Sequence, residues 1–194
     1  MFTLGKVIRI SHIRSVYNLL PLKTGIFNSL QMIRLATSKD VTFFYDLYMH
    51  AEVNPFLLYE NMTMPAFEPI FNELVQDQLL YVFETSQKPV GMFKFIPLKH
   101  RNAHIAYLGG VAIDPVQSGK GYGALMIQEI IDLGKSKGLL RIELSTAVAN
   151  QKAISLYEKC GFKKEGVLQK YTHLKSENRF VDEVMMAYLY PAKL

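Results

Sequence analysis

The chain of 194 residues contains one cysteine, Cys160, and no tryptophan. A single thiol excludes an intramolecular disulfide and any metal site built from several thiolates. The five histidines do not have the spacing of metal ligands, so no metal is expected. No uninterrupted apolar run approaches the roughly 20 residues that a membrane-spanning helix needs. We therefore expect a globular, cytoplasmic protein without a metal and without a membrane span.

Acidic side chains are absent from the first thirty residues, and the first carboxylate of the chain is Asp40. The same segment holds four of the basic residues, Lys6, Arg9, Arg14 and Lys23. Without them, residues 31–194 carry 18 basic and 17 acidic side chains, a net charge of +1. The formal charge of +5 is therefore mostly a property of the opening segment. Because no basic and aromatic residues interleave as in a nucleic-acid reader, no nucleic-acid partner is expected.

We expect two parts, a basic N-terminal extension over residues 1–30 and one domain over residues 31–194. The extension has the composition of a transit peptide or of a basic amphipathic helix on a surface. An extension of this kind also results when the start codon is placed too early and the natural start is Met32. The last interpretation is favoured, and the sequence leaves the other two open.

From Met32 onward, the spacing of apolar residues predicts an α+β domain. Strands are expected at about 32–36, 79–84, 89–97, 104–113, 139–146, 166–174 and 180–189. Helices are expected at about 40–50, 66–77 and 150–160, with a long one that ends near Lys137. Residues 52–60 are expected to be irregular because Asn54-Pro55 breaks a helix. Hairpins and one strand–helix–strand unit predict a mixed, mostly antiparallel sheet of about seven strands flanked by helices.

A glycine-rich loop, Ser118-Gly119-Lys120-Gly121-Tyr122-Gly123, separates the third predicted strand from the long helix. Glycines let backbone N–H groups approach an anion, and a helix N-terminus adds partial positive charge. The loop is therefore suited to a phosphate or pyrophosphate, although a plain tight turn also uses glycines. Ala124 excludes the dinucleotide fingerprint, and Gly121 excludes the Walker loop, which needs Ser or Thr there.

A second motif follows about thirty residues later, with Asn150, Ala153, Tyr157, Glu158, Gly161 and Phe162 in order. Together the two motifs resemble the GNAT acetyltransferase superfamily, over roughly Met32 to the end of the chain. The closing part, with Val181-Asp182 and Met186, resembles the branch that acetylates small amines, amino acids and protein N-termini. One departure is Ser118, where the family usually has Gln or Arg, and Gln117 lies one residue too early. We expect the backbone of the loop to bind its anion nonetheless.

The resemblance implies roles for individual residues. The loop would hold the pyrophosphate of acetyl-CoA through Ser118, Gly119, Lys120, Gly121, Tyr122, Gly123 and Ala124. Backbone groups at Val111 and Ile113 would pair with the pantetheine arm. Asn150 would contact the cofactor through its amide, although Asn before a helix is most often an N-cap. Tyr157 would protonate the departing thiolate, although its helical position also suits a core aromatic.

The expected function is N-acetylation, with the primary amine of a small molecule attacking acetyl-CoA directly. An amino acid or related amine is the favoured acceptor. The alternatives are a protein N-terminal acetyltransferase and a catalytically silent CoA-binding or regulatory module, and a homodimer is left open. Residues 52–60 would form part of the acceptor site. Glu60, His104 and Glu143 are candidates for a general base, and the sequence selects none of them.

Overall fold

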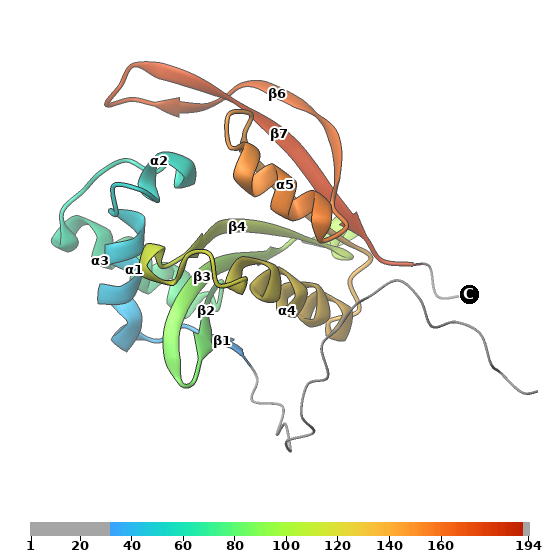
Figure 1. Ribbon diagram of the computed structural model, residues 1–194, viewed down its shortest axis with the longest axis horizontal. Coiled ribbons are helices and arrows are strands. Elements are labelled where there is room, and N and C mark those ends of the chain that lie inside the picture. Colours follow the sequence, from blue (N-terminus) through green and yellow to red (C-terminus); the bar gives the residue numbers. More distant parts are fainter. Residues whose placement is uncertain (1–31, 192–194) are drawn as a thin grey trace, which may run out of the picture. The chain divides into compact units, whose positions relative to one another are not determined.

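The computed structural model of the protein describes residues 32–191, so the predicted extension over residues 1–30 lies outside the described residues. Within the described part, seven strands form one sheet in the order β1-β2-β3-β4-β5-β7-β6 (Figure 1). Neighbouring strands are antiparallel except for the parallel pair β4 and β5. The strands are β1 (Ile33–Leu35), β2 (Leu80–Thr85), β3 (Lys88–Pro97), β4 (Ile105–Ile113), β5 (Arg141–Ala147), β6 (Lys163–Leu174) and β7 (Arg179–Leu189). The predicted α+β class and mostly antiparallel sheet are confirmed.

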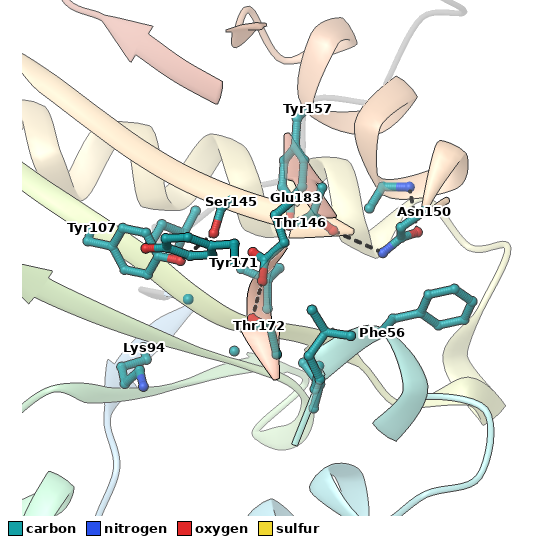
Figure 2. A pocket seen from close by; sticks show the side chains of 17 residues that line it. Phe56, Lys94, Tyr107, Ser145, Thr146, Asn150, Tyr157, Tyr171, Thr172 and Glu183 are labelled. Atoms are coloured by element: carbon teal, nitrogen blue, oxygen red, sulfur yellow. Dashed lines mark hydrogen bonds between the residues drawn. The ribbon is translucent and has the colours of Figure 1, made fainter. Parts of the chain in front are cut away.

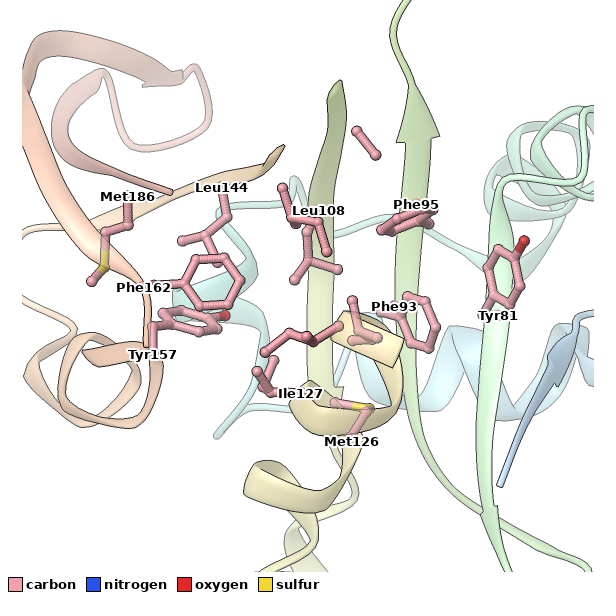
Figure 3. Packing of buried hydrophobic residues seen from close by; sticks show 14 of the residues in the cluster. Tyr81, Phe93, Phe95, Leu108, Met126, Ile127, Leu144, Tyr157, Phe162 and Met186 are labelled. Carbon is pink, nitrogen blue, oxygen red and sulfur yellow. The ribbon is translucent and has the colours of Figure 1, made fainter. Parts of the chain in front are cut away.

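In residues 32–191, five α-helices flank this sheet: α1 (Val41–Tyr48), α2 (Asn54–Leu57), α3 (Met64–Gln76), α4 (Tyr122–Ser136) and α5 (Gln151–Lys159). Alternation along the strands gives each face its own core. Val82 and Met92 are buried in one core with residues of α1 and α3. Phe83 and Phe93 are buried in the other, where Figure 3 shows Phe93 with Met126 of α4. No described helix has both the length and the apolarity to cross a membrane.

Two elements differ from the sequence prediction. Residues 52–60, predicted to be irregular, contain the short helix α2, with Pro55 in its first turn. Proline is tolerated there because the first N–H groups of a helix have no intrahelical partner. Strand β6 begins at Lys163, three residues earlier than predicted, because it pairs with β7 from Lys163 onward.

A β-bulge interrupts β4 near its middle. The register with β3 shifts between Met92 and Lys94, and Gly110 has a left-handed φ of 58°. The bulge reverses the faces of the strand, since Leu108 lies in the core with α4 whereas Ala112 lies in the core with α1 and α3. Gly110 is required because a Cβ there would lie 2.6 Å from the Tyr48 hydroxyl oxygen.

The parallel pairing of β4 and β5 is short. It joins Ile105, Ala106 and Tyr107 to Arg141, Ile142 and Glu143, and the described pairing ends there. Beyond this point β5 continues alongside β7 as far as Ala147, while β4 continues alongside β3. The sheet therefore opens between β4 and β5 on the side of the β4 bulge, and the loops that follow both strands converge on this opening.

Candidate active site

Two cavities meet at the opening between β4 and β5. The larger has a volume of about 550 Å³ and the smaller about 230 Å³. They share six lining residues: Phe56, Leu57, Val111, Asn150, Ala153 and Tyr157. These come from α2, β4, the start of α5 and α5 itself. Molecules in the two cavities would therefore both border these six residues.

The glycine loop and the motif of α5 line the larger cavity together. Ten of the eleven predicted site residues are in its wall: Val111, Ile113, Ser118, Gly119, Gly121, Tyr122, Gly123, Ala124, Asn150 and Tyr157. Lys120 is not in the wall, and its ammonium group donates a hydrogen bond of 2.8 Å to Gln117 Oε1. Gln117 itself lines the cavity, which the sequence analysis did not expect.

The backbone of the loop is arranged for an anion. Gly119 and Gly121 have φ values of 78° and 81°, in the left-handed region that disfavours other residues. Gly121 is the N-cap of α4, a helix of 15 residues, whose first N–H groups face the loop. A Cβ at either glycine would meet nothing within 4 Å, so the space above the backbone is open. Open backbone N–H groups at a helix N-terminus suit a pyrophosphate.

Val111 and Ile113 follow the β4 bulge. Their side chains pack against the hydrophobic core beneath α4, although both residues line the larger cavity. Their apolar side chains offer no acid, base or nucleophile, so any contact specific to a polar ligand would come from their backbone groups. This placement agrees with the role that the resemblance implies for them.

Asn150 serves as the N-cap of α5. Its Oδ1 accepts a hydrogen bond from the N–H of Ala153 at 3.2 Å, and its Nδ2 donates to Thr146 Oγ1 at 3.2 Å. Figure 2 shows both bonds at the edge of the smaller cavity. The amide is thus held in a fixed orientation between β5 and α5. The N-cap interpretation is correct, and the side chain also borders both cavities.

Tyr157 is 6% exposed and packs its ring against Phe162 at a centroid distance of 5.8 Å. It is therefore a core aromatic residue that also lies at the junction of the two cavities. Burial raises the pKa of its phenol above the usual 10.0, and the nearby Tyr107 and Cys160 raise it further. The hydroxyl consequently stays protonated at neutral pH and can donate a proton.

The smaller cavity has polar walls from five strands of the sheet, β3 to β7 (Figure 2). Glu183 of β7 is 5% exposed and accepts a hydrogen bond from the Thr172 hydroxyl. The Tyr107 and Ser145 hydroxyls lie 2.9 Å apart in a hydrogen bond across the opening. The register of β6 with β7 shifts between Leu168 and Thr172, and Tyr171 and Thr172 at this shift line the cavity. The cavity therefore combines a buried carboxylate with several hydroxyl groups.

None of the three candidate bases from the sequence analysis lines either cavity. Glu143 is paired with Arg141 at 2.8 Å, and His104 is exposed. Glu60 accepts hydrogen bonds from the backbone of the turn between β6 and β7. Glu183 is the carboxylate that lines the smaller cavity, and Glu52 lines the larger one. Glu183 has a weak sequence signal, because it is adjacent to a second acid, Asp182. Only the structure shows that Asp182 is exposed and Glu183 is buried.

The segment around α2 closes both cavities on one side. Leu58 packs into a small core with Ala147, Leu174 and Val181, and Glu60 binds the β6–β7 turn. These contacts hold Phe56 and Leu57 in the shared wall. Of residues 52–60, which were predicted to form part of the acceptor site, Phe56, Leu57 and Leu58 line the smaller cavity, whereas Glu52 and Val53 line only the larger one. Across residues 32–191, no group of three or more His, Cys, Asp or Glu side chains is placed to hold a metal ion.

Comparison with known proteins places this geometry in context. The sequence model described as the acetyltransferase (GNAT) family matches residues 41–162. Spermidine N(1)-acetyltransferase of Vibrio cholerae is 29% identical over 148 residues, which cover 73% of this chain and 83% of the relative. The [ribosomal protein bS18]-alanine N-acetyltransferase of Salmonella typhimurium is 30% identical over 66 residues, 34% of this chain and 45% of the relative.

Solved structures share the fold. The crystal structure of spermidine N-acetyltransferase from Vibrio cholerae in complex with CoA and spermine superposes with a TM-score of 0.71 and 26% identity, covering 81% of this chain and 94% of the other. Ribosomal-protein-alanine N-acetyltransferase from Brucella melitensis gives a TM-score of 0.67 at 21% identity, covering 81% and 99%. The resemblance stated from the two motifs is confirmed.

Proposed function

The chain belongs to the acetyltransferase (GNAT) family and is an acetyl-CoA-dependent N-acetyltransferase, and we propose that it acetylates the primary amine of a small molecule, an amino acid or a related amine. The observation that carries this proposal is the position of Tyr157 at the junction of the two cavities. The larger cavity would hold acetyl-CoA, and the smaller would hold the acceptor. The reacting thioester and amine would then meet beside one proton donor.

The residues of the larger cavity fit acetyl-CoA. The open backbone around Gly119 and Gly121 would bind the pyrophosphate at the start of α4. Backbone groups of Val111 and Ile113 would pair with the pantetheine arm as an added strand does. Asn150 would lie beside the arm where it enters the shared wall. Acetyl-CoA supplies the acetyl group as a thioester, and these residues orient it.

Tyr157 acts as the acid in the transfer. The amine nitrogen forms a C–N bond with the acetyl carbonyl carbon, and the C–S bond to CoA breaks. The Tyr157 hydroxyl donates its proton to the leaving sulfur, which would otherwise depart as a thiolate. Its raised pKa means that the hydroxyl carries its proton when the transfer begins.

Glu183 acts as the proton acceptor for the amine. An ammonium group cannot attack a carbonyl carbon, so a proton has to leave the nitrogen. Glu183 is the carboxylate among the described residues that line the smaller cavity, and the Thr172 hydroxyl fixes its orientation. Burial of this carboxylate near the acceptor also favours binding of a cationic amine.

The proposal is tested by thiol release from acetyl-CoA over a panel of amines, with Tyr157→Phe as the comparison. Turnover of a small amine, lowered about 100-fold or more by Tyr157→Phe with CoA binding retained, is the expected result. Equal rates for the two proteins would rule out Tyr157 as the acid. CoA binding without turnover of any amine would identify a silent module, and turnover of peptides alone would identify a protein N-terminal acetyltransferase.

Three further predictions accompany this proposal. Residues 1–30 are proposed to be dispensable, so a chain that starts at Met32 should retain CoA binding and turnover. Loss of either would contradict this. A cytoplasmic location and a homodimer remain predictions, which fractionation of cells and light scattering of the purified protein would test.

A further inference from the structure

Lys94 lies on β3 and lines the smaller cavity. It pairs with Gly109 of β4, and its Cε lies 3.5 Å from the position that a Cβ on Gly109 would occupy. Glycine at this position leaves room for the aliphatic part of the lysine side chain. The absence of side chains at Gly109 and Gly110 thus leaves the Lys94 side chain room to reach the cavity.

The Lys94 ammonium group has no described partner. Within residues 32–191, it takes part in no hydrogen bond and no ion pair, and burial lowers its pKa from the usual 10.5. A partly buried cation without a counter-charge loses hydration and gains nothing from the protein in return. An anion bound in the cavity would supply the missing partner.

The smaller cavity is lined by one negatively charged and one positively charged side chain. Glu183 and Lys94 are the fully charged side chains among the described residues of its lining, and they come from β7 and β3. Figure 2 shows them on different walls, with Tyr107 and Thr172 also bordering the cavity. A zwitterion has the complementary pattern, with an amine for the carboxylate and an anion for the ammonium group.

We propose that Lys94 binds an anionic group of the acceptor, so that the preferred acceptors are small amines that carry a carboxylate or a similar anion. This inference rests on the proposed function and assigns one residue to its selectivity. A polyamine lacks an anion and would place a second cation near Lys94, which is repulsive at short range. Lys94 is therefore a residue that discriminates against polyamines, and it takes no part in proton transfer.

The test compares matched acceptors in wild type and Lys94→Met. Each amino acid is paired with its own amide, which keeps the amine and removes the carboxylate, and spermidine is included. The measured quantity is the kcat/KM of the acid divided by that of the amide. Comparing this ratio between the two proteins cancels the different basicities of the amines. Lys94→Met should lower the ratio by roughly tenfold to 100-fold, the range for a lost charged hydrogen bond.

Controls separate a selective effect from a structural one. Lys88→Met removes an exposed lysine of the same strand and should leave the ratio unchanged. Lys94→Arg should retain most of the preference for acids. CoA affinity should stay within about twofold in all variants, since Lys94 does not line the larger cavity.

The outcomes are distinct. A wild-type preference for amides or spermidine, or an equal loss on acids and amides in Lys94→Met, would overturn the role of Lys94 while the proposed function stands. Absence of turnover with every amine in the panel would instead overturn the proposed function.

Discussion

Glu60 and Lys175 are 115 positions apart in the sequence, yet Glu60 Oε1 accepts a hydrogen bond of 2.6 Å from the Lys175 backbone N–H. The neighbouring Ser176 N–H donates to the same oxygen at 3.3 Å. Hydrogen bonds from the turn, including one with the Ser176 side chain, hold the pKa of Glu60 below its usual value. This contact fastens the segment after α2 to the β6–β7 turn.

Loss of this contact should loosen the wall of both cavities. In Glu60→Ala, Phe56 and Leu57 lose part of their anchor, so we expect the KM for acceptor and for acetyl-CoA each to rise severalfold, with a smaller change in kcat. Steady-state kinetics with both substrates varied checks this. Glu177→Ala, which removes an exposed carboxylate paired with Arg179 in the same turn, is the control. An unchanged KM for both substrates would show that the contact does not position the wall.

Replacement of Glu183 by Gln keeps its size and its ability to accept a bond from Thr172, but removes its capacity to take a proton. We expect kcat/KM at pH 7 to fall about 100-fold. The deficit should shrink as pH rises, because a larger share of the amine is then already neutral. A pH profile of kcat/KM measures this. Asp182→Asn changes the adjacent exposed carboxylate and should have little effect, whereas a deficit independent of pH would assign Glu183 to binding alone.

Gly121 should be sensitive to substitution despite the space around it. In Gly121→Ala the new Cβ meets no atom within 4 Å, but the residue has to keep its left-handed φ of 81°. The cost is about 1–2 kcal/mol of unfolding free energy. The Cβ would also project into the backbone site for the pyrophosphate, so CoA should bind several times more weakly. Urea denaturation and CoA titration measure the two effects, with Gly166→Ala, an open site without a left-handed φ, as the control.

Asp40 joins the start of α1 to the edge of the sheet. Arg34 of β1 binds both its carboxylate oxygens at 2.8 Å, and the N–H and hydroxyl of Thr37 donate to one of them. Burial would raise the pKa of Asp40, but these hydrogen bonds outweigh burial and lower it below the usual 3.8. The carboxylate is 7% exposed, whereas Arg34 is more accessible to solvent, which weakens the charge interaction.

Asp40→Asn should lower the free energy of unfolding by about 1–2 kcal/mol at pH 7. Because the folded pKa is depressed, the stabilisation from ionised Asp40 is fully present above the unfolded pKa and is lost as pH falls through the folded value. The difference between wild type and variant should therefore shrink below about pH 4. Urea denaturation across pH 3 to 7 measures it. Asp46→Asn, on the exposed face of α1, is the control, and a constant difference across this range would contradict the assignment.

The sequence predicted the elements of the fold well because they depend on local signals. Periodic apolar residues locate the strands, glycines mark the loop before α4, and Asn150 has the position of an N-cap. Each of these features depends on residues within one or two turns of each other. The ten predicted residues of the larger cavity therefore come together as expected.

The smaller cavity could not be predicted in the same way. Lys94 and Glu183 are polar residues on strands, and alternation alone places such residues on a solvated face. They border a cavity because β4 separates from β5 and because α2 covers the opening. Both events depend on contacts distant in sequence, such as Gly110 with Tyr48 and Glu60 with Lys175. Lys120 differs from the other predicted residues of the loop, since its side chain is outside the wall of the larger cavity and binds Gln117, which lines that cavity.

The short seam between β4 and β5 has a mechanical consequence. Three residue pairs connect β4 to β5. Lys94 of β3 and the glycine loop after β4 lie on one side of this seam, and Glu183 of β7 lies on the other. A small rotation about this seam would widen or narrow both cavities together, because they share Tyr157 and the wall from α2. A molecule that wedges into one cavity would thus alter the width of the other, so that the two substrates are expected to influence each other's binding through the geometry of the sheet.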